Sequence, residues 1–166
     1  MTVRRAPGAV WALVLLLVAA AGCASKGPTV ERASHSPGAR ELYVARSYLL
    51  YQREPNFDER SLWENELDLR IASYLRRHPE LEQSPRYTEF RFLKHVTPGS
   101  TRGEVRTLLE EPREETVDPD RMAALAKRHW AELHTKAKEA WVYPAGWILY
   151  FDDTAVIAIL RSMATR

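Results

Sequence analysis

The sequence predicts an α+β fold in which N-terminal helices and a short capped helix pack on a three-stranded antiparallel β-meander. Two patterns lead to this expectation. Apolar residues recur at helical spacing through residues 41–111, whereas residues 140–160 contain three short runs rich in aromatic and β-branched residues, separated by turn signals. A chain of 166 residues is long enough to bury one hydrophobic core.

The short helix that organises the prediction begins near Thr101. A proline–glycine turn precedes it, and Thr101 followed by Glu104 forms the pattern of a capping box. Residues 105–109 then place valine and two leucines at i, i+3 and i+4, and Pro112 ends the helix. Because about ten residues of helix are marginal in water, this helix needs a surface on which to pack.

The N-terminus has the pattern of a bacterial lipoprotein signal peptide over residues 1–22. Arg4 and Arg5 precede an apolar run, Ala9–Ala21, that is too short to span a bilayer, and the run ends at Cys23, the single cysteine of the chain. The resemblance implies cleavage before Cys23, acylation of its thiol and a lipid anchor in the membrane. The alternatives are an ordinary cleaved signal with a spare thiol, or an uncleaved anchor.

The residue after the cysteine bears on the destination of such a lipoprotein. Ala24 fits sorting to the outer membrane, with the domain facing the periplasm, better than retention in the inner membrane. Residues 23–40 are rich in glycine, proline and serine and contain no aromatic residue, so we expect the lipidated cysteine to be followed by a flexible tether.

Residues 41–95 form the predicted helical region. One apolar face runs to about Arg53, and a second helix is expected from an N-cap at Asp58 to His78, just before a proline. A third, short helix is expected over residues 84–94. We expect the charged residues of these helices to form a solvent-exposed face. The alternative is a helix face that binds a partner.

A helical insert is predicted over residues 119–137, as one helix from about 120 to 136. His129 and His134 are five residues apart, a spacing that does not direct two ligands to one metal, so we expect no metal site there. Glu114 and Glu115 are expected in a charged loop, and no residue pattern indicates a cofactor.

The strand runs at 140–143, 147–151 and 154–160 define two sheet faces that are both apolar. If Tyr143 pairs with Trp147 and Phe151 pairs with Thr154, one face holds Trp141, Tyr143, Trp147, Leu149, Phe151, Val156, Ala158 and Leu160, and the other holds Val142, Ile148, Tyr150, Ala155, Ile157 and Ile159. Both faces need a cover. We favour the chain's own helices, and a protein partner is the alternative. The candidate partner-binding residues are Trp141, Tyr143, Trp147 and Tyr150.

The C-terminal part resembles the SmpA/OmlA (BamE-like) family of small outer-membrane lipoproteins. The resemblance runs over residues 99–160 and is carried by Gly99, Thr101, Val105, Leu109, Pro112, Trp141-Val142-Tyr143 and Leu149-Tyr150-Phe151. It implies two helices on a three-stranded sheet, here residues 96–162, and an accessory role in inserting β-barrels into the outer membrane. Glu110 replaces a family glycine, so a positive φ is not expected there.

The charge balance and the motifs present argue against two classes of function. Removing Arg4 and Arg5 with the leader leaves 22 basic and 22 acidic residues, which argues against a nucleic-acid partner. No nucleophile motif or metal-ligand spacing is present, so we expect no catalytic residue, no metal and no enzyme. The expected function is a non-enzymatic envelope lipoprotein that binds an envelope protein. The alternative is a structural, ligand-sequestering or inhibitory lipoprotein of the same fold.

Overall fold

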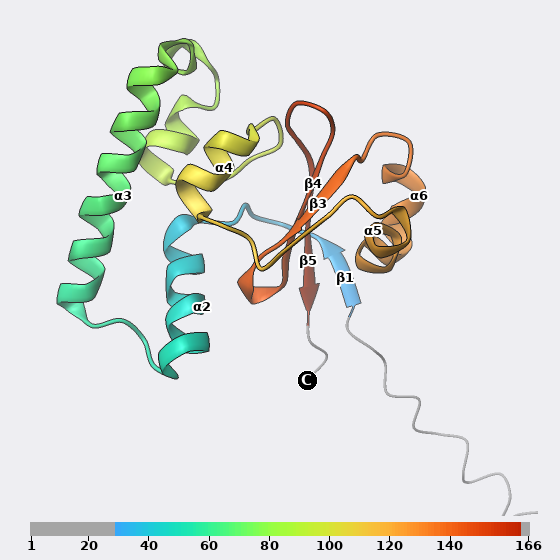
Figure 1. Ribbon diagram of the computed structural model, residues 1–166, viewed down its shortest axis with the longest axis horizontal. Coiled ribbons are helices and arrows are strands. Elements are labelled where there is room, and N and C mark those ends of the chain that lie inside the picture. Colours follow the sequence, from blue (N-terminus) through green and yellow to red (C-terminus); the bar gives the residue numbers. More distant parts are fainter. Residues whose placement is uncertain (1–28, 164–166) are drawn as a thin grey trace, which may run out of the picture.

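The computed structural model describes residues 29–163 as an α+β fold with helices on both faces of one antiparallel sheet (Figure 1). The sheet has five strands in the order β1-β5-β4-β3-β2. The strands are β1 (Thr29–Arg32), β2 (Glu114–Thr116), β3 (Glu139–Val142), β4 (Trp147–Phe151) and β5 (Val156–Met163).

The predicted meander is confirmed as β3-β4-β5, but the sheet is wider than predicted by one strand at each edge. Strand β1 lies inside the expected tether, so that prediction is wrong for the described part, because Thr29–Arg32 pairs with β5 and buries Val30. Strand β2 lies where a charged loop was expected and pairs with β3. Both edge strands are short and mostly polar, so the alternation of apolar and polar residues does not reveal them in the sequence. The same features limit pairing of the sheet edges with other chains.

The predicted face assignment of β5 is wrong in part. The Tyr143 N–H donates to the Trp147 carbonyl at 2.8 Å, as expected, but Phe151 pairs with Val156 and not with Thr154. The Asp152 side chain accepts from the backbone N–H groups of Thr154 and Ala155 and so lengthens the turn. Because of the register shift at Tyr150/Phe151, Ala158 and Leu160 lie on the same face as Ile148 and Tyr150.

The N-terminal helices join the short capped helix on one face of the sheet. They are α2 (Ala39–Tyr51), α3 (Phe57–Arg77) and α4 (Arg102–Leu109), and their core includes Leu42, Leu67, Ile71, Val105 and Leu108. Thr101 caps α4 as predicted, accepting from the Glu104 N–H at 3.2 Å, but only this half of the predicted capping box is found, because the Glu104 carboxylate pairs with Arg86. This face of the sheet contributes Trp141, Tyr143, Trp147, Leu149, Phe151 and Val156.

The insert covers the opposite face. It forms α5 (Pro119–Ala126), a 3₁₀ turn η3 (Lys127–His129) and α6 (Trp130–Leu133), so the single helix expected there is interrupted at Lys127, where φ is 50°. Met122, Ala126 and Leu133 pack on Ile148, Tyr150 and Leu160. The Tyr150 hydroxyl donates to the Met122 carbonyl at 2.8 Å and fastens the insert to the sheet.

Two further details of the helical region differ from the sequence prediction. Helix α3 is capped by Asn56, and not by Asp58, through a complete capping box with Glu59. The third helix, expected over residues 84–94, is present as a short helical segment over residues 87–93, most of it the π-helical turn η2 (Glu89–Leu93). A 3₁₀ turn η1 (Pro79–Gln83) precedes it, and the short turn η4 (Pro144–Gly146) joins β3 to β4. No helix within residues 29–163 has the length and apolarity needed to cross a bilayer.

Candidate interaction surface on the helical half

The aromatic residues of the sheet are buried beneath the chain's own helices. Trp141, Trp147 and Tyr150 are 0% exposed and Tyr143 is 1% exposed. The alternative in which a partner covers the sheet is therefore wrong for this conformation, and these four residues do not form a partner-binding face. Both faces are closed from within, as the more favoured expectation stated.

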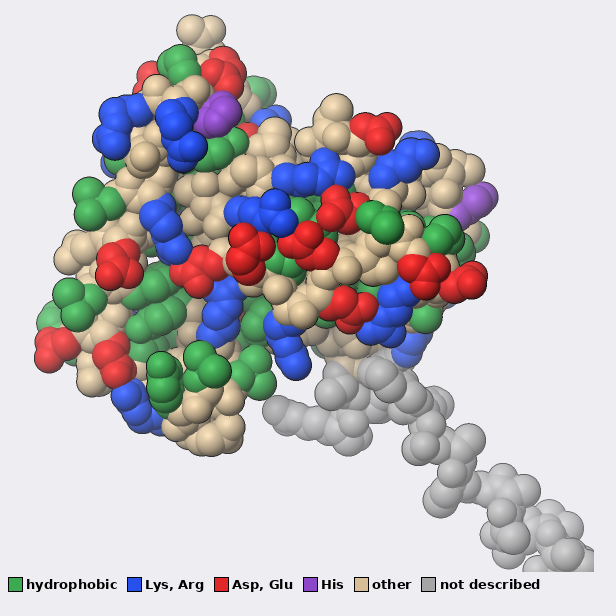
Figure 2. Space-filling view, viewed as in Figure 1, with side chains coloured by type: hydrophobic (Ala, Val, Ile, Leu, Met, Phe, Trp, Pro, Cys, Tyr) green, Lys and Arg blue, Asp and Glu red, His purple; other side chains and the backbone are tan. Residues whose placement is uncertain are grey.

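The exposed apolar surface lies on the helical half instead. Eleven large apolar side chains are exposed in the described part of the chain, and nine of them belong to residues 39–95. Figure 2 shows such side chains over the lower ends of α2 and α3. The nine are Tyr48, Leu49, Leu50, Tyr51, Phe57, Leu62, Leu69, Phe92 and Leu93. If the protein has a docking surface, this half carries it.

Five of these side chains form what we call the hairpin tip, the last turn of α2 and the first residue of α3 (Tyr48–Tyr51 and Phe57). Leu50, Tyr51 and Phe57 are 71%, 66% and 75% exposed. Helix α2 ends at Gln52 in the left-handed conformation, with φ 56°, and Asn56 begins α3. The turn between two helices therefore presents five of the eleven exposed large apolar side chains of the described chain, Phe57 being the most exposed of them.

The hairpin tip is held rigidly by local hydrogen bonds. Arg53 donates to both carboxylate oxygens of Glu59, at 2.7 and 2.6 Å, and the Ser47 hydroxyl donates to the Arg53 carbonyl at 2.8 Å. Glu59 also accepts from the Asn56 N–H at 2.8 Å. The hydrogen bonds from Arg53, and next the backbone bond from Asn56, lower the pKa of Glu59 to about 2.

Two leucines on the outer side of α3 form a second exposed group, the α3 stripe. Leu62 and Leu69 are 65% and 70% exposed and lie seven residues apart, about 10 Å along the helix. They point away from the face that buries Leu67 and Ile71. Helix α3 therefore carries two exposed leucines on the side opposite its core, with the polar residues Asn65 and Glu66 between them.

Glu110 fixes the helical half to the sheet. Its carboxylate accepts from Arg46 of α2 at 2.9 Å and from Arg70 of α3 at 2.8 Å, and its carbonyl accepts from the Tyr143 hydroxyl at 3.0 Å. Burial raises the pKa of Tyr143. Glu110 has φ 61° and ψ −158°, so the expectation of an ordinary backbone there is wrong. The hydrogen bonds of the Glu110 carboxylate and carbonyl hold its backbone in a conformation that glycine adopts more easily.

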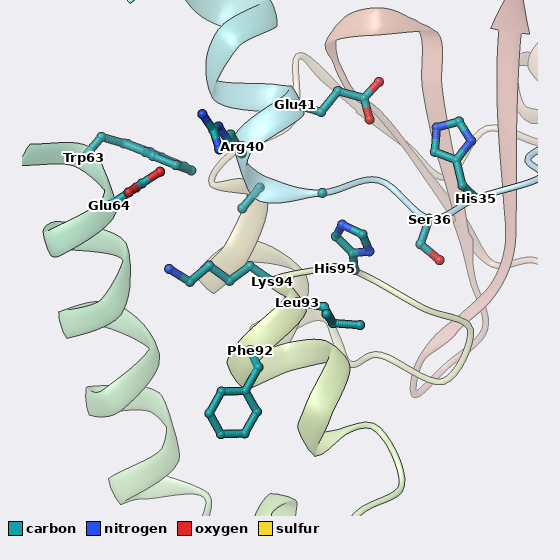
Figure 3. Close-up of a pocket in the computed structure, with 12 residues that line it drawn as sticks. His35, Ser36, Arg40, Glu41, Trp63, Glu64, Phe92, Leu93, Lys94 and His95 are labelled. Atoms are coloured by element: carbon teal, nitrogen blue, oxygen red, sulfur yellow. The ribbon is translucent and has the colours of Figure 1, made fainter. Parts of the chain in front are cut away.

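A hollow lies between the start of α2, helix α3 and the end of η2 (Figure 3). Lys94 reaches toward α3, where it pairs with Asp68 at 3.0 Å, and His95 packs so closely on Gly38 that an added Cβ would lie 2.8 Å from its ring. His35 enters from the segment after β1 and contacts the Trp147 ring edge-on. No cluster of three potential metal ligands occurs within residues 29–163.

A buried carboxylate lies at the first turn of α4. Glu104 is 3% exposed and accepts from Arg86 at 3.2 Å, while its second oxygen has no protein donor in the described chain. Tyr74 lies beside it, donating to or accepting from Thr101 at 3.2 Å. The ion pair joins the segment before α4 to the helix itself, which supports a structural role in positioning α4.

The predicted lipid anchor depends on a single residue, Cys23. Cys23 falls outside the described residues, so its lipidation stays a prediction. The hairpin tip and the α3 stripe were not recognised as sites from the sequence, because exposure of Leu50, Phe57 or Leu62 depends on how α2 and α3 pack.

Comparison with known proteins adds no relative. No protein-family model matches the chain, and no curated protein and no solved structure matches it. The likeness to the SmpA/OmlA family therefore depends on the residue pattern alone.

Proposed function

We propose that this chain is a non-enzymatic lipoprotein of the bacterial envelope that is anchored in the outer membrane through lipid on Cys23, faces the periplasm and binds another envelope protein. The leader pattern supports the location, because a basic start, a short apolar run and a small-residue approach to the cysteine suit lipidation. Two or more acyl chains would hold the protein firmly at the membrane.

The observation that carries the binding role is the α3 stripe. Exposing two leucines on the side of a helix opposite its core costs hydration free energy unless another surface covers them. Their spacing of one heptad is the one at which an amphipathic helix packs against another helix. We therefore propose a helix of an envelope protein as the partner. Assistance in outer-membrane assembly is the role suggested by the SmpA/OmlA likeness.

Lipidation is tested by metabolic labelling with a clickable fatty acid. Wild-type protein should take the label and fractionate with the outer membrane, and Cys23→Ser should do neither. Labelling of the Cys23→Ser variant, or no labelling of the wild type, would contradict the proposed anchor.

Partner binding is tested with a photo-crosslinking amino acid at position 62, compared with the same amino acid at Glu132 of α6, an exposed position on the far side of the sheet. Crosslinks to one envelope protein from position 62 alone, abolished by Leu69→Glu, are the expected result. Crosslinks of equal pattern from both positions would contradict a specific α3 partner.

The role in outer-membrane assembly needs a separate measurement. Deletion of the gene should lower the levels of outer-membrane barrel proteins and raise permeability, and Leu62→Glu/Leu69→Glu should reproduce the loss. Unchanged barrel levels with a lipidated protein would favour the structural or sequestering alternative.

A further inference from the structure

We propose that the hairpin tip docks into the surface of the membrane that holds Cys23, so that the domain lies against the lipid and does not hang from it. This inference rests on the proposed lipid anchor, and it assigns to the tip a lipid surface as its binding partner. It concerns residues 48–57 and is separate from the protein contact proposed for the α3 stripe.

The chemistry of the tip suits the boundary between lipid headgroups and acyl chains. Leu49, Leu50 and Phe57 offer apolar side chains that gain free energy on leaving water. Tyr48 and Tyr51 flank them, and tyrosine favours this boundary because its ring is apolar while its hydroxyl remains hydrated. Leucine, phenylalanine and tyrosine are residue types found in interfacial membrane contacts.

Two exposed acids, Glu54 and Asp58, lie at the turn and would remain in the headgroup water when the tip docks. Arg53 and Glu59 neutralise each other in a two-bond ion pair, and Glu54 accepts from the Tyr48 hydroxyl at 3.2 Å. The buried Pro55 and the Asn56 capping box fix the turn. A fixed turn loses little conformational entropy when it docks, so the exposed side chains can be used for binding at little ordering cost.

The length of chain between the anchor and the fold is short. Six residue steps separate Cys23 from Thr29, where β1 begins, and they can span at most about 20 Å. Thr29 must therefore stay within about 20 Å of the membrane surface if Cys23 carries the lipid. A folded domain held this closely rests one of its sides on the bilayer.

The side that meets the bilayer follows from the arrangement of elements. Figure 1, viewed down the shortest axis, shows the start of β1 and the turn between α2 and α3 along the same lower edge of the molecule. The apolar side chains of the tip are seen at this edge in Figure 2. The far end of α3 lies at the opposite edge of the molecule and α6 lies above the level of the tip, whereas α5 lies near the start of β1. The short connection from Cys23 to β1 and the exposed apolar side chains of the tip thus indicate the same edge of the molecule as the one that contacts the membrane.

The experiment uses the chain from Cys23 onward, since all contacts of the fold described above are made within residues 29–163. Its single thiol is coupled to a maleimide lipid in vesicles of phosphatidylethanolamine and phosphatidylglycerol, or capped with a soluble maleimide. Hydrogen exchange of the backbone amides is then compared between the two forms. Coupling through the thiol makes the result independent of whether cells acylate Cys23.

The expected result is slower exchange over residues 48–57 on vesicles, by about tenfold, with no change over residues 71–77 at the far end of α3. Leu50→Glu/Phe57→Glu should abolish the slowing. The matched control, Leu62→Glu/Leu69→Glu, adds the same two charges at residues of similar exposure and should leave it intact.

Three results would overturn the proposal. Equal exchange at the tip in both forms would show that it does not touch lipid, and slowing confined to another segment would assign the membrane contact to a different face. Slowing in the capped protein that grows with protein concentration would identify the tip as a contact between copies of this chain. None of these results bears on cellular lipidation, which the fatty-acid label measures separately.

Discussion

At the scale of single residues, Glu110 shows how side-chain contacts can hold a backbone conformation that its residue type disfavours. With φ 61° and ψ −158°, it occupies a region that glycine adopts readily and other residues adopt at a cost of about 1–3 kcal/mol. Arg46, Arg70 and the Tyr143 hydroxyl are the contacts that offset this cost.

Replacing Glu110 separates the strain from the contacts. Glu110→Ala loses both arginine contacts and keeps the strain, whereas Glu110→Gly loses the same contacts and relieves the strain. We expect Glu110→Gly to be more stable than Glu110→Ala by about 1–2 kcal/mol, measured by urea unfolding. Equal stabilities would show that the backbone is not strained at this position.

The lowered pKa of Glu59 predicts how the stability of the fold depends on acid pH. Its pKa is lowered from 4.5 to about 2 in the folded state, chiefly by Arg53, so the stabilisation is fully present above pH 4.5 and is lost as the pH falls toward 2. The midpoint of thermal unfolding should therefore fall between pH 4.5 and pH 2, and Glu59→Gln should reduce that fall. Circular dichroism at a series of pH values measures it. Glu66→Gln, which removes a carboxylate from the exposed side of the same helix, is the control.

At the scale of elements, the tight turn between β3 and β4 depends on Gly146. Its φ is +79°, and an added Cβ would lie 2.2 Å from the carbonyl oxygen of Ser162 in the neighbouring strand β5. Gly99 also has a positive φ, +90°, but its added Cβ would meet only the flexible Arg86 side chain, at 3.4 Å. Both glycines therefore have a positive φ, but only at Gly146 would an added Cβ clash with the backbone of a neighbouring strand.

Alanine at these two positions tests the difference. Gly99→Ala should cost about 1–2 kcal/mol, from the positive φ alone. Gly146→Ala should cost more than Gly99→Ala, since β4 and β5 must separate to admit the methyl group, and urea unfolding of both variants measures it. Similar losses in the two variants would mean that the turn shifts without disturbing the sheet.

The same scale shows which elements could be predicted from sequence. The α4 cap and the β3-β4-β5 meander follow from short-range signals, namely Thr101 three residues before Glu104 and strand runs separated by turns. Strands β1 and β2 carry few apolar residues and exist because β5 and β3 offer them an edge. Such long-range pairing leaves no periodic trace in the sequence.

The candidate site was predicted less well than the fold. Trp141, Tyr143, Trp147 and Tyr150 were chosen for being aromatic on a sheet that needed a cover, and the chain's own helices supply that cover. Composition indicated that a large apolar surface exists, but only the packing of α2 and α3 decides which part of it stays exposed.

At the scale of the whole molecule, the distance between Cys23 and β1 should control how the domain sits on a membrane. Inserting a flexible segment of about 20 Gly and Ser residues after Gly27 should weaken the slowing of exchange at the hairpin tip on vesicles, because a longer leash lowers the local concentration of lipid at the tip. An inserted segment of the same length in the turn between α6 and β3, near Thr135, should leave it unchanged. Undiminished slowing with the long leash would mean that the tip binds lipid without help from the anchor.

The place of β1 in the sheet has a mechanical consequence. A pull exerted on an anchored Cys23 would enter the fold at Thr29, the first residue of β1. Because β1 pairs with β5 from Thr29 opposite Met163 to Arg32 opposite Leu160, the hydrogen bonds between these two strands would be the first in the fold to bear that load. Strand β1 would then be the element of the domain that first resists the force.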